Sequence, residues 1–118
     1  MMDAASNAAA RIATLSPAAF TAVVGQPLAV QIATDPFVGQ VLAGAVLVAV
    51  HERPRAAMPG SLRMPFILLF KVADPGAFVA GDCNISVPDQ GWLGPVYCER
   101  TLPPASDPSG AYFAIGFA

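Results

Sequence analysis

The chain has 118 residues, of which 55% are hydrophobic and only 12% are charged, and its formal net charge is -2. This length predicts one domain that buries roughly two-thirds of its unfolded surface. The weak negative charge argues against nucleic-acid binding, which requires a basic patch to displace phosphate counterions. So large an apolar share predicts either an unusually well-filled core or a surface that a partner covers.

The N-terminal residues do not have the features of a targeting signal. Asp3 lies where a signal peptide carries positive charge, and the apolar run 41–50 is about half the length that spans a bilayer as a helix. We therefore expect no membrane insertion. The localisation stays unknown, with an extracellular or virion-associated place after release left open. We expect residues 1–15 to form an Ala-rich arm and residues 16–118 a single β domain.

The first predicted element of that domain is a short helix. Ser16 is a favourable N-cap residue, Pro17 suits the first helical position, and Gly25 is a typical stop.

From residue 28 onwards the hydrophobic period changes from that of a helix to that of a strand. Six predicted strands follow, at 28–33, 45–51, 65–72, 83–87, 95–102 and 111–117. Turn-rich segments without helices separate them, so the predicted fold class is all-β, a six-stranded antiparallel meander that forms a small barrel or sandwich. A helix over 41–50 is the alternative there, because short apolar runs are ambiguous.

The last strand has two predicted arrangements. If a barrel closes, 111–117 pairs with the first strand after Gly25 and points Phe113, Ile115 and Phe117 into the core. If the sheet stays open, the strand is an edge to which another subunit can add a strand.

Several motifs in these strands carry a family resemblance. They are FTAVVG (20–25), PFILLF (65–70), AGDCNISVP (80–88), LGPVYCERTLP (93–103) and YFAIGF (112–117). Their succession resembles a family of small bacterial domains of unknown function, whose genes are often seen near those for tail-collar, phage-tail-like fibre proteins. The chain departs from the family pattern at Ala80 and Cys83, where Gln and Tyr are usual. The resemblance implies a fold and an assembly role, and it supplies no catalytic residues.

The two cysteines, Cys83 and Cys98, border a turn-like centre. Two cysteines and the single histidine, His51, are too few for a four-ligand zinc site. A hairpin whose turn centres on Gln90–Gly91 places the cysteines directly opposite each other, within reach of a disulfide after slight adjustment. Two reduced core thiols are the alternative. Both interpretations are structural.

Two further features are candidate contacts with a partner. Trp92, near the tip of that hairpin, is either an interface anchor or a lid folded over the core. The segment 52–65 carries Arg53, Arg55 and Arg63, which either pair with acidic groups of a partner or are solvated.

These observations predict a protein without catalytic chemistry. We expect no enzyme activity, no metal site and no cofactor. The function that we expect is structural: a domain that docks into, or forms part of, a phage-tail-like or extracellular fibrous assembly, through a protein partner or its own copies. The alternative is a small β-barrel that binds an apolar ligand or a protein partner.

Overall fold

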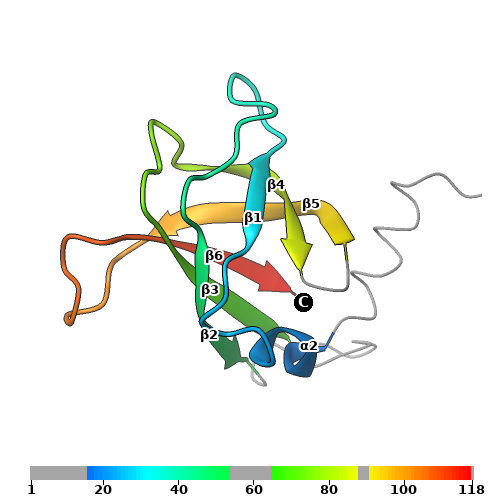
Figure 1. Ribbon diagram of the computed structural model, residues 1–118, viewed down its shortest axis with the longest axis vertical. Coiled ribbons are helices and arrows are strands. Elements are labelled where there is room, and N and C mark those ends of the chain that lie inside the picture. Colours follow the sequence, from blue (N-terminus) through cyan, green and yellow to red (C-terminus); the bar gives the residue numbers. More distant parts are fainter. Residues whose placement is uncertain (1–15, 54–64, 88–90, 118) are drawn as a thin grey trace, which may run out of the picture.

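The computed structural model describes residues 16–53, 65–87 and 91–117. One antiparallel sheet of six strands and one short helix make up this part of the chain (Figure 1), so the expected fold class is confirmed. The elements are α2 (Pro17–Thr21), β1 (Ala29–Ile32), β2 (Val46–Glu52), β3 (Phe66–Val72), β4 (Ala80–Val87), β5 (Gly91–Thr101) and β6 (Ala111–Phe117). The expected arm, residues 1–15, lies outside the described residues.

The helix α2 begins where the sequence predicts it. Ser16 has extended N-cap geometry and Pro17 follows it, although the Ser16 side chain makes no capping hydrogen bond. The helix ends at Thr21, and Gly25 adopts a left-handed φ of 88° a few residues later. Only glycine adopts such a φ without strain. The turn therefore directs the chain from α2 into the first strand.

The strand order of the sheet is β1-β4-β5-β6-β3-β2. The last strand, β6, is thus in the middle, paired with β3 along its whole length and with β5 over Tyr112–Ile115. The predicted pairing of this strand with the first one after Gly25 is wrong, and so is the open-edge alternative. Phe113, Ile115 and Phe117 nevertheless point into the core as expected.

The two edge strands, β1 and β2, approach each other without forming a regular ladder. Isolated bridges join Pro27 to Val46 and Gln31 to Val41, and the backbone N–H of Leu28 donates to the carbonyl of Ala45 at 2.9 Å. The sheet is therefore strongly curled but is not closed into a barrel. The helix alternative for 41–50 is wrong, because these residues lead into β2.

The free side of β2 is interrupted. Val48 is an extra residue in the register with β3, where Leu47 and Ala49 face successive partners. The strand then ends in His51 and Glu52, both exposed. A bulge and charged residues are the usual protection of an edge strand against pairing with other chains.

Alternate side chains of every strand fill the inside of the curled sheet, and aromatic rings close both of its ends. At the end near α2, Phe20 packs on Phe66 and Phe117 with ring centroids 5.7 and 5.6 Å away. At the other end, Phe78 stacks on Phe113 at 5.8 Å. Burying a phenylalanine completely stabilises a fold by roughly 1.5–3 kcal/mol, so these rings are a large part of what holds the helix and the loops to the sheet.

Candidate functional site

Three connecting segments, residues 33–45, 73–79 and 102–110, extend from the end of the sheet away from α2, and together we call them the loop end (Figure 1). Ala43 bridges to Asp74, and Phe37 contacts the ring of Phe78 edge-on at 6.0 Å, so the first two loops touch. The third loop follows β5, whose Arg100 donates its backbone N–H to the carbonyl of Val79 at 2.7 Å. The first two loops thus contact each other, and the third is linked to the second through β5.

The loop end exposes aliphatic side chains. Four of the five large hydrophobic side chains that are more than half exposed in the described residues lie there. They are Val38, Val41, Val79 and Leu102, the last with 89% of its surface exposed. Single exposed apolar residues are ordinary, but their concentration on one end of a domain indicates a contact surface.

An open pocket of about 180 Å³ lies between the first two loops, lined by Ile32, Gln40, Val41, Leu42, Ala43, Asp74, Pro75 and Gly76. Typical small-molecule sites occupy about 300–1,000 Å³, so this pocket suits one long side chain better than a cofactor. Oδ1 of Asp74 accepts a hydrogen bond from the backbone N–H of Gly76 at 3.0 Å. No other described group bonds to this carboxylate, which leaves Oδ2 for a cation or a donor.

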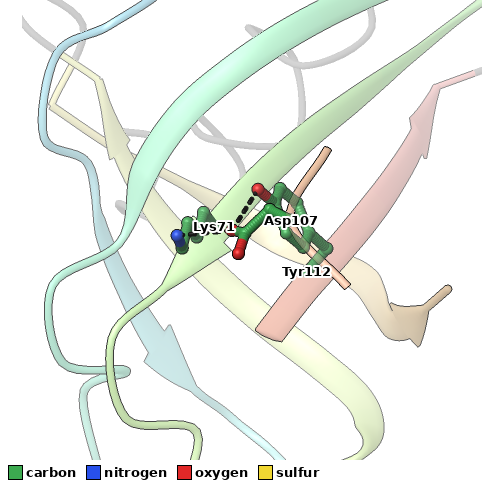
Figure 2. Close-up of polar contacts among 3 residues, drawn as sticks. All are labelled: Lys71, Asp107 and Tyr112. Carbon is green, nitrogen blue, oxygen red and sulfur yellow. Dashed lines mark hydrogen bonds and ion pairs between the residues drawn. The ribbon is translucent and has the colours of Figure 1, made fainter. Parts of the chain in front are cut away.

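A polar cluster of three side chains lies beside the third loop (Figure 2). Asp107 accepts at Oδ2 from the Lys71 ammonium at 2.5 Å and from the Tyr112 hydroxyl at 2.8 Å. Lys71 and Tyr112 are cross-strand neighbours on β3 and β6, and the Lys71 Nζ lies 5.9 Å from the Tyr112 ring centroid. One carboxylate therefore binds the loop to two strands.

The protonation of this cluster follows from these contacts. The hydrogen bond from Lys71, then that from Tyr112, lowers the pKa of the Asp107 carboxyl. The hydrogen bond to Asp107 raises the pKa of Lys71 and likewise that of Tyr112. A lysine nucleophile or a tyrosine base needs a lowered pKa, so these shifts do not favour catalysis. The contacts instead hold the 102–110 loop against β3 and β6, and we call Lys71, Asp107 and Tyr112 the clamp.

Gly110 makes this clamp possible. A Cβ at position 110 would collide with the Asp107 carboxylate and would lie 2.5 Å from Cε2 of Tyr112. Only a residue without a side chain lets the loop approach Tyr112 this closely.

The two cysteines are neighbours on β4 and β5, but not directly opposite each other. Cys83 pairs with Val96, whereas Cys98 pairs with Gly81, so the cysteines are diagonal. The predicted register is wrong because Gly91, expected at the centre of the turn, is a strand residue that pairs with Val87; the extra residue of β5 near Gly94 offsets this shift by only one position. In the structure both residues are buried free thiols.

The thiols interact with each other in the core. A side-chain hydrogen bond to Cys83, reinforced by burial, raises the pKa of the Cys98 thiol. The Cys83 Sγ also lies 3.8 Å from the carbonyl oxygen of Gly81. The same hydrogen bond lowers the pKa of the Cys83 thiol, but both side chains are completely buried, so neither sulfur is accessible to a substrate.

The remaining predicted contact residues lie away from the loop end. Trp92 is the second residue of β5, opposite Ser86, and 47% of its surface is exposed. Arg53 is exposed directly after β2, and its backbone N–H donates to the carbonyl of Pro65 at 2.6 Å. Arg55 and Arg63 lie outside the described residues. The structure thus does not bring Trp92 and Arg53 into one site with the pocket.

Two general features of the described residues bear on function. No group of three or more His, Cys, Asp or Glu side chains among them could hold a metal ion. None of their helices is long and apolar enough to cross a membrane.

Comparisons with known proteins add no relative. No protein-family model, no curated protein and no solved structure matches the chain. The resemblance to small bacterial domains therefore stays a prediction.

Neither the pocket nor the Lys71–Asp107–Tyr112 cluster is predicted from the sequence. Asp74 and Asp107 lie in the turn-rich segments between the predicted strands. A signal for the pocket was present in the spacing of Asp74, Pro75 and Gly76 directly after a buried strand, since such a turn holds its aspartate at the rim of the sheet.

Proposed function

We propose that this protein is a non-enzymatic assembly domain that docks to a protein through its loop end. The observation that carries the proposal is the concentration of exposed aliphatic side chains there, with Leu102 almost fully exposed. Burial of apolar surface contributes roughly 25 cal/mol per Å², so a partner that covers Val38, Val41, Val79 and Leu102 gains several kcal/mol.

The polar groups of the described part support a role without catalysis. Lys71, Asp107 and Tyr112 bond to one another, and the two cysteines are buried free thiols. Such groups stabilise a fold but are poorly placed to attack a substrate.

The resemblance gives a narrower form of the proposal, in which the assembly is phage-tail-like or an extracellular fibre. It depends on the motifs alone. The clustering of exposed aliphatics at one end supports the broader proposal and is compatible with a subunit that stacks on another.

A ligand-binding domain is the second candidate, favoured by the open pocket beside Asp74. Its support is weaker, because the interior of the sheet is filled by buried side chains, among them Phe70, Phe113 and Ile115. A pocket of about 180 Å³ holds part of a ligand rather than a whole one.

The proposal is tested by replacing the exposed aliphatics in matched sets. The test variant carries Val38→Ser, Val41→Ser and Leu102→Ser, and the control carries Val24→Ser and Val48→Ser, which are exposed elsewhere. We expect the test variant to lose association in light scattering after size-exclusion chromatography, while the control keeps it. If a partner is involved, cross-linking to that partner should fall in the same variant. Equal behaviour of wild type and both variants would contradict the proposal.

A further inference from the structure

Two exposed aromatic side chains lie on one strand, outside the loop end. Trp92 and Tyr97 belong to β5, and they expose 47% and 55% of their surface. Both carry a large apolar area, so their exposure on the same strand indicates a contact surface. Docking through the loop end does not account for either residue, because neither belongs to it.

A β-bulge turns both aromatic side chains to the outer face of the sheet. In a regular strand, residues five positions apart point to opposite faces, so Trp92 and Tyr97 would lie on different sides. The extra residue of β5 near Gly94 changes this alternation. Leu93 and Val96 are both buried although they are three positions apart, and the two aromatic residues that flank them are both exposed. Bulges commonly redirect side chains in this way next to functional sites.

The neighbouring strand, β4, places a row of polar side chains beside the two rings. Ser86 pairs with Trp92 and Asp82 pairs with Tyr97, and Asn84 lies between these two pairs. Ser86 and Asp82 are four positions apart on β4. At about 3.4 Å per residue, the two aromatic positions are therefore separated by roughly 14 Å along the sheet. We call these five residues the aromatic strip.

Asn84 occupies the middle of the aromatic strip because residue 94 is a glycine. A Cβ at Gly94 would collide with Oδ1 of Asn84, so the asparagine side chain takes the space that the glycine leaves. Asp82 is exposed, and Ser86 and Asn84 are half-buried. Within the described residues, none of these three side chains forms a hydrogen bond. Their polar atoms are therefore available to a ligand.

The chemistry of the aromatic strip indicates the class of its ligand. The rings of Trp92 and Tyr97 require a flat apolar face. The Asp82 carboxylate only accepts hydrogen bonds, whereas the Asn84 amide donates and accepts them. A pyranose sugar meets both requirements, because its C–H groups form an apolar face and its hydroxyl groups, which donate and accept, surround the ring. A chain of pyranose rings is long enough to reach from one aromatic side chain to the other.

The charges around the aromatic strip disfavour a polyanionic ligand. Asp82 and Glu99 are both exposed on the outer face of the sheet. The basic residue of β5, Arg100, has its guanidinium 5.8 Å from the ring centroid of the core residue Phe113. Among the described residues it forms no ion pair with either carboxylate. Nucleic acids and other polyanions are therefore repelled, whereas a neutral ligand is not.

A proline-rich peptide is the other extended ligand that stacks on aromatic side chains. It fits the polar row less well, because proline has no N–H to donate to the Asp82 carboxylate. The hydroxyl groups of a sugar supply such donors along the whole chain.

We propose that the aromatic strip binds an extended neutral carbohydrate chain. Pyranose rings stack on Trp92 and Tyr97, and sugar hydroxyl groups bond to Asn84 and Asp82. This function is separate from docking through the loop end, because the two surfaces share no residue. A domain with both surfaces connects a protein partner to a polysaccharide.

The fluorescence of Trp92 measures the binding, because Trp92 is the only tryptophan of the chain. The full chain is titrated with three neutral oligosaccharides: cellohexaose, chitohexaose and mannohexaose. We expect a saturable change with at least one of them. Glucose cannot reach both rings, so it should bind at least about tenfold more weakly than the oligosaccharide that binds.

Substitutions test the contribution of each ring, with isothermal titration calorimetry as the measurement because one of them removes the fluorophore. Trp92→Ala and Tyr97→Ala should each weaken binding roughly tenfold or more, as the loss of an aromatic stacking partner usually does. Tyr97→Phe keeps the ring and should keep most of the affinity. Asn84→Ala should also weaken binding, because it removes hydrogen bonds to the sugar. Circular dichroism verifies that each variant folds.

The matched control is the variant with Val38→Ser, Val41→Ser and Leu102→Ser, which changes exposed apolar residues outside the aromatic strip. It should bind the oligosaccharide like the wild type. Because its association and its sugar binding are measured separately, a failure of loop-end docking and a failure of carbohydrate binding are distinguishable.

Several results would overturn this inference. One is the absence of a saturable change with all three oligosaccharides up to about 10 mM, tenfold above the dissociation constant of about 1 mM that characterises weak binding. Another is sugar binding that Trp92→Ala and Tyr97→Ala leave unchanged, since the site would then lie elsewhere. Heparin and a hexaproline peptide with a terminal arginine are the remaining probes. If either changed the Trp92 fluorescence while the neutral oligosaccharides did not, the ligand class would be wrong.

Discussion

The hydroxyl of Tyr112 donates to Oδ2 of Asp107 at 2.8 Å and thereby fastens the 102–110 loop to the centre of the sheet. Because β6 pairs with a strand on each side, Tyr112 is held rigidly. The hydrogen bond from Tyr112 therefore fixes the position of the loop that carries Leu102. This one hydrogen bond therefore links the middle of the fold to the surface that we propose for docking.

Asp107→Asn tests the clamp through the titration of Tyr112. Removing the carboxylate removes the main cause of the raised pKa of Tyr112, which should fall towards the ordinary value of about 10. Ultraviolet absorbance of the phenolate reports the change, and Tyr112→Phe identifies which of the two tyrosines titrates. A Tyr112 titration that is the same in wild type and Asp107→Asn would show that the contact is not formed in solution.

The same variant has a defined pH dependence of stability. Asp107 has a lowered pKa in the fold, so its contribution is present above the ordinary carboxyl pKa of about 3.9 and is lost as the pH falls. Lys71 and Tyr112 have raised pKa values, so theirs is complete below about pH 10 and is lost as the pH rises further. Wild type should therefore exceed Asp107→Asn in melting temperature at neutral pH, with the difference shrinking in acid and in strong alkali. A difference independent of pH would contradict this account.

Thiol reactivity tests the state of the cysteines. Cys83 and Cys98 are buried and the pKa of Cys98 is raised, so neither should react with a water-soluble thiol reagent in the folded protein, while both react in denaturant. Mass spectrometry before and after labelling counts the free thiols. A native mass lower by two hydrogens, with no thiol labelled in denaturant, would instead establish the disulfide that the sequence left open.

Two glycines form a matched pair for measuring backbone constraint. Gly94 has a φ of 153°, and a Cβ there would collide with the Asn84 side chain and lie 2.9 Å from the carbonyl oxygen of Cys83. Gly94→Ala should therefore lower the free energy of unfolding by roughly 1–3 kcal/mol. A Cβ at Gly116 would meet nothing within 4 Å. Gly116→Ala should be neutral or stabilising by roughly 0.5–1 kcal/mol, because it reduces the backbone entropy lost on folding. Chemical denaturation measures both, and equal effects would refute this description of the β4–β5 bulge.

Removal of β6 tests its central position. Deleting residues 112–118 takes away the partner of β3 and of β5 together with Phe113, Ile115 and Phe117, each worth roughly 1.5–3 kcal/mol when buried. We expect a chain without cooperative unfolding in circular dichroism or dispersed amide signals in NMR spectra. A truncated protein that stayed soluble and folded would show that β6 is not central.

The strands were predictable because the alternation of apolar and polar residues that identifies them lies within each short segment. Alternation of buried and exposed residues in 66–72 and 111–117 identifies β3 and β6 almost to the residue, and Pro17 marks the start of α2. The beginning of β5 was missed because Gly91, Trp92 and Gly94 have the composition of a turn, although Leu93 is buried as in a strand.

Pairing was harder to predict because it depends on distant residues. Cys83 and Cys98 were assigned opposite positions from a turn near Gln90. Gly91 has the composition of a turn but pairs with Val87 in the ladder, and this pairing, which the local sequence does not indicate, shifts the register. The position of β6 between β3 and β5 is likewise decided by how the whole sheet buries its apolar face. The pocket and the clamp follow from that pairing, so they could not be predicted before it.

The central position of β6 also sets how the chain must fold. Phe66 pairs with Phe117, 51 positions later, so the ladder between β3 and β6 cannot form until almost the whole described sequence is available. Contacts of such long range are formed late and make folding slow. Until then the edges of β3 and β5 that pair with β6 are unpaired. The β6 strand of another molecule can pair with them as well as the β6 strand of the same chain can. Refolding at high concentration should therefore yield strand-exchanged dimers, whereas refolding at high dilution should yield the monomer fold.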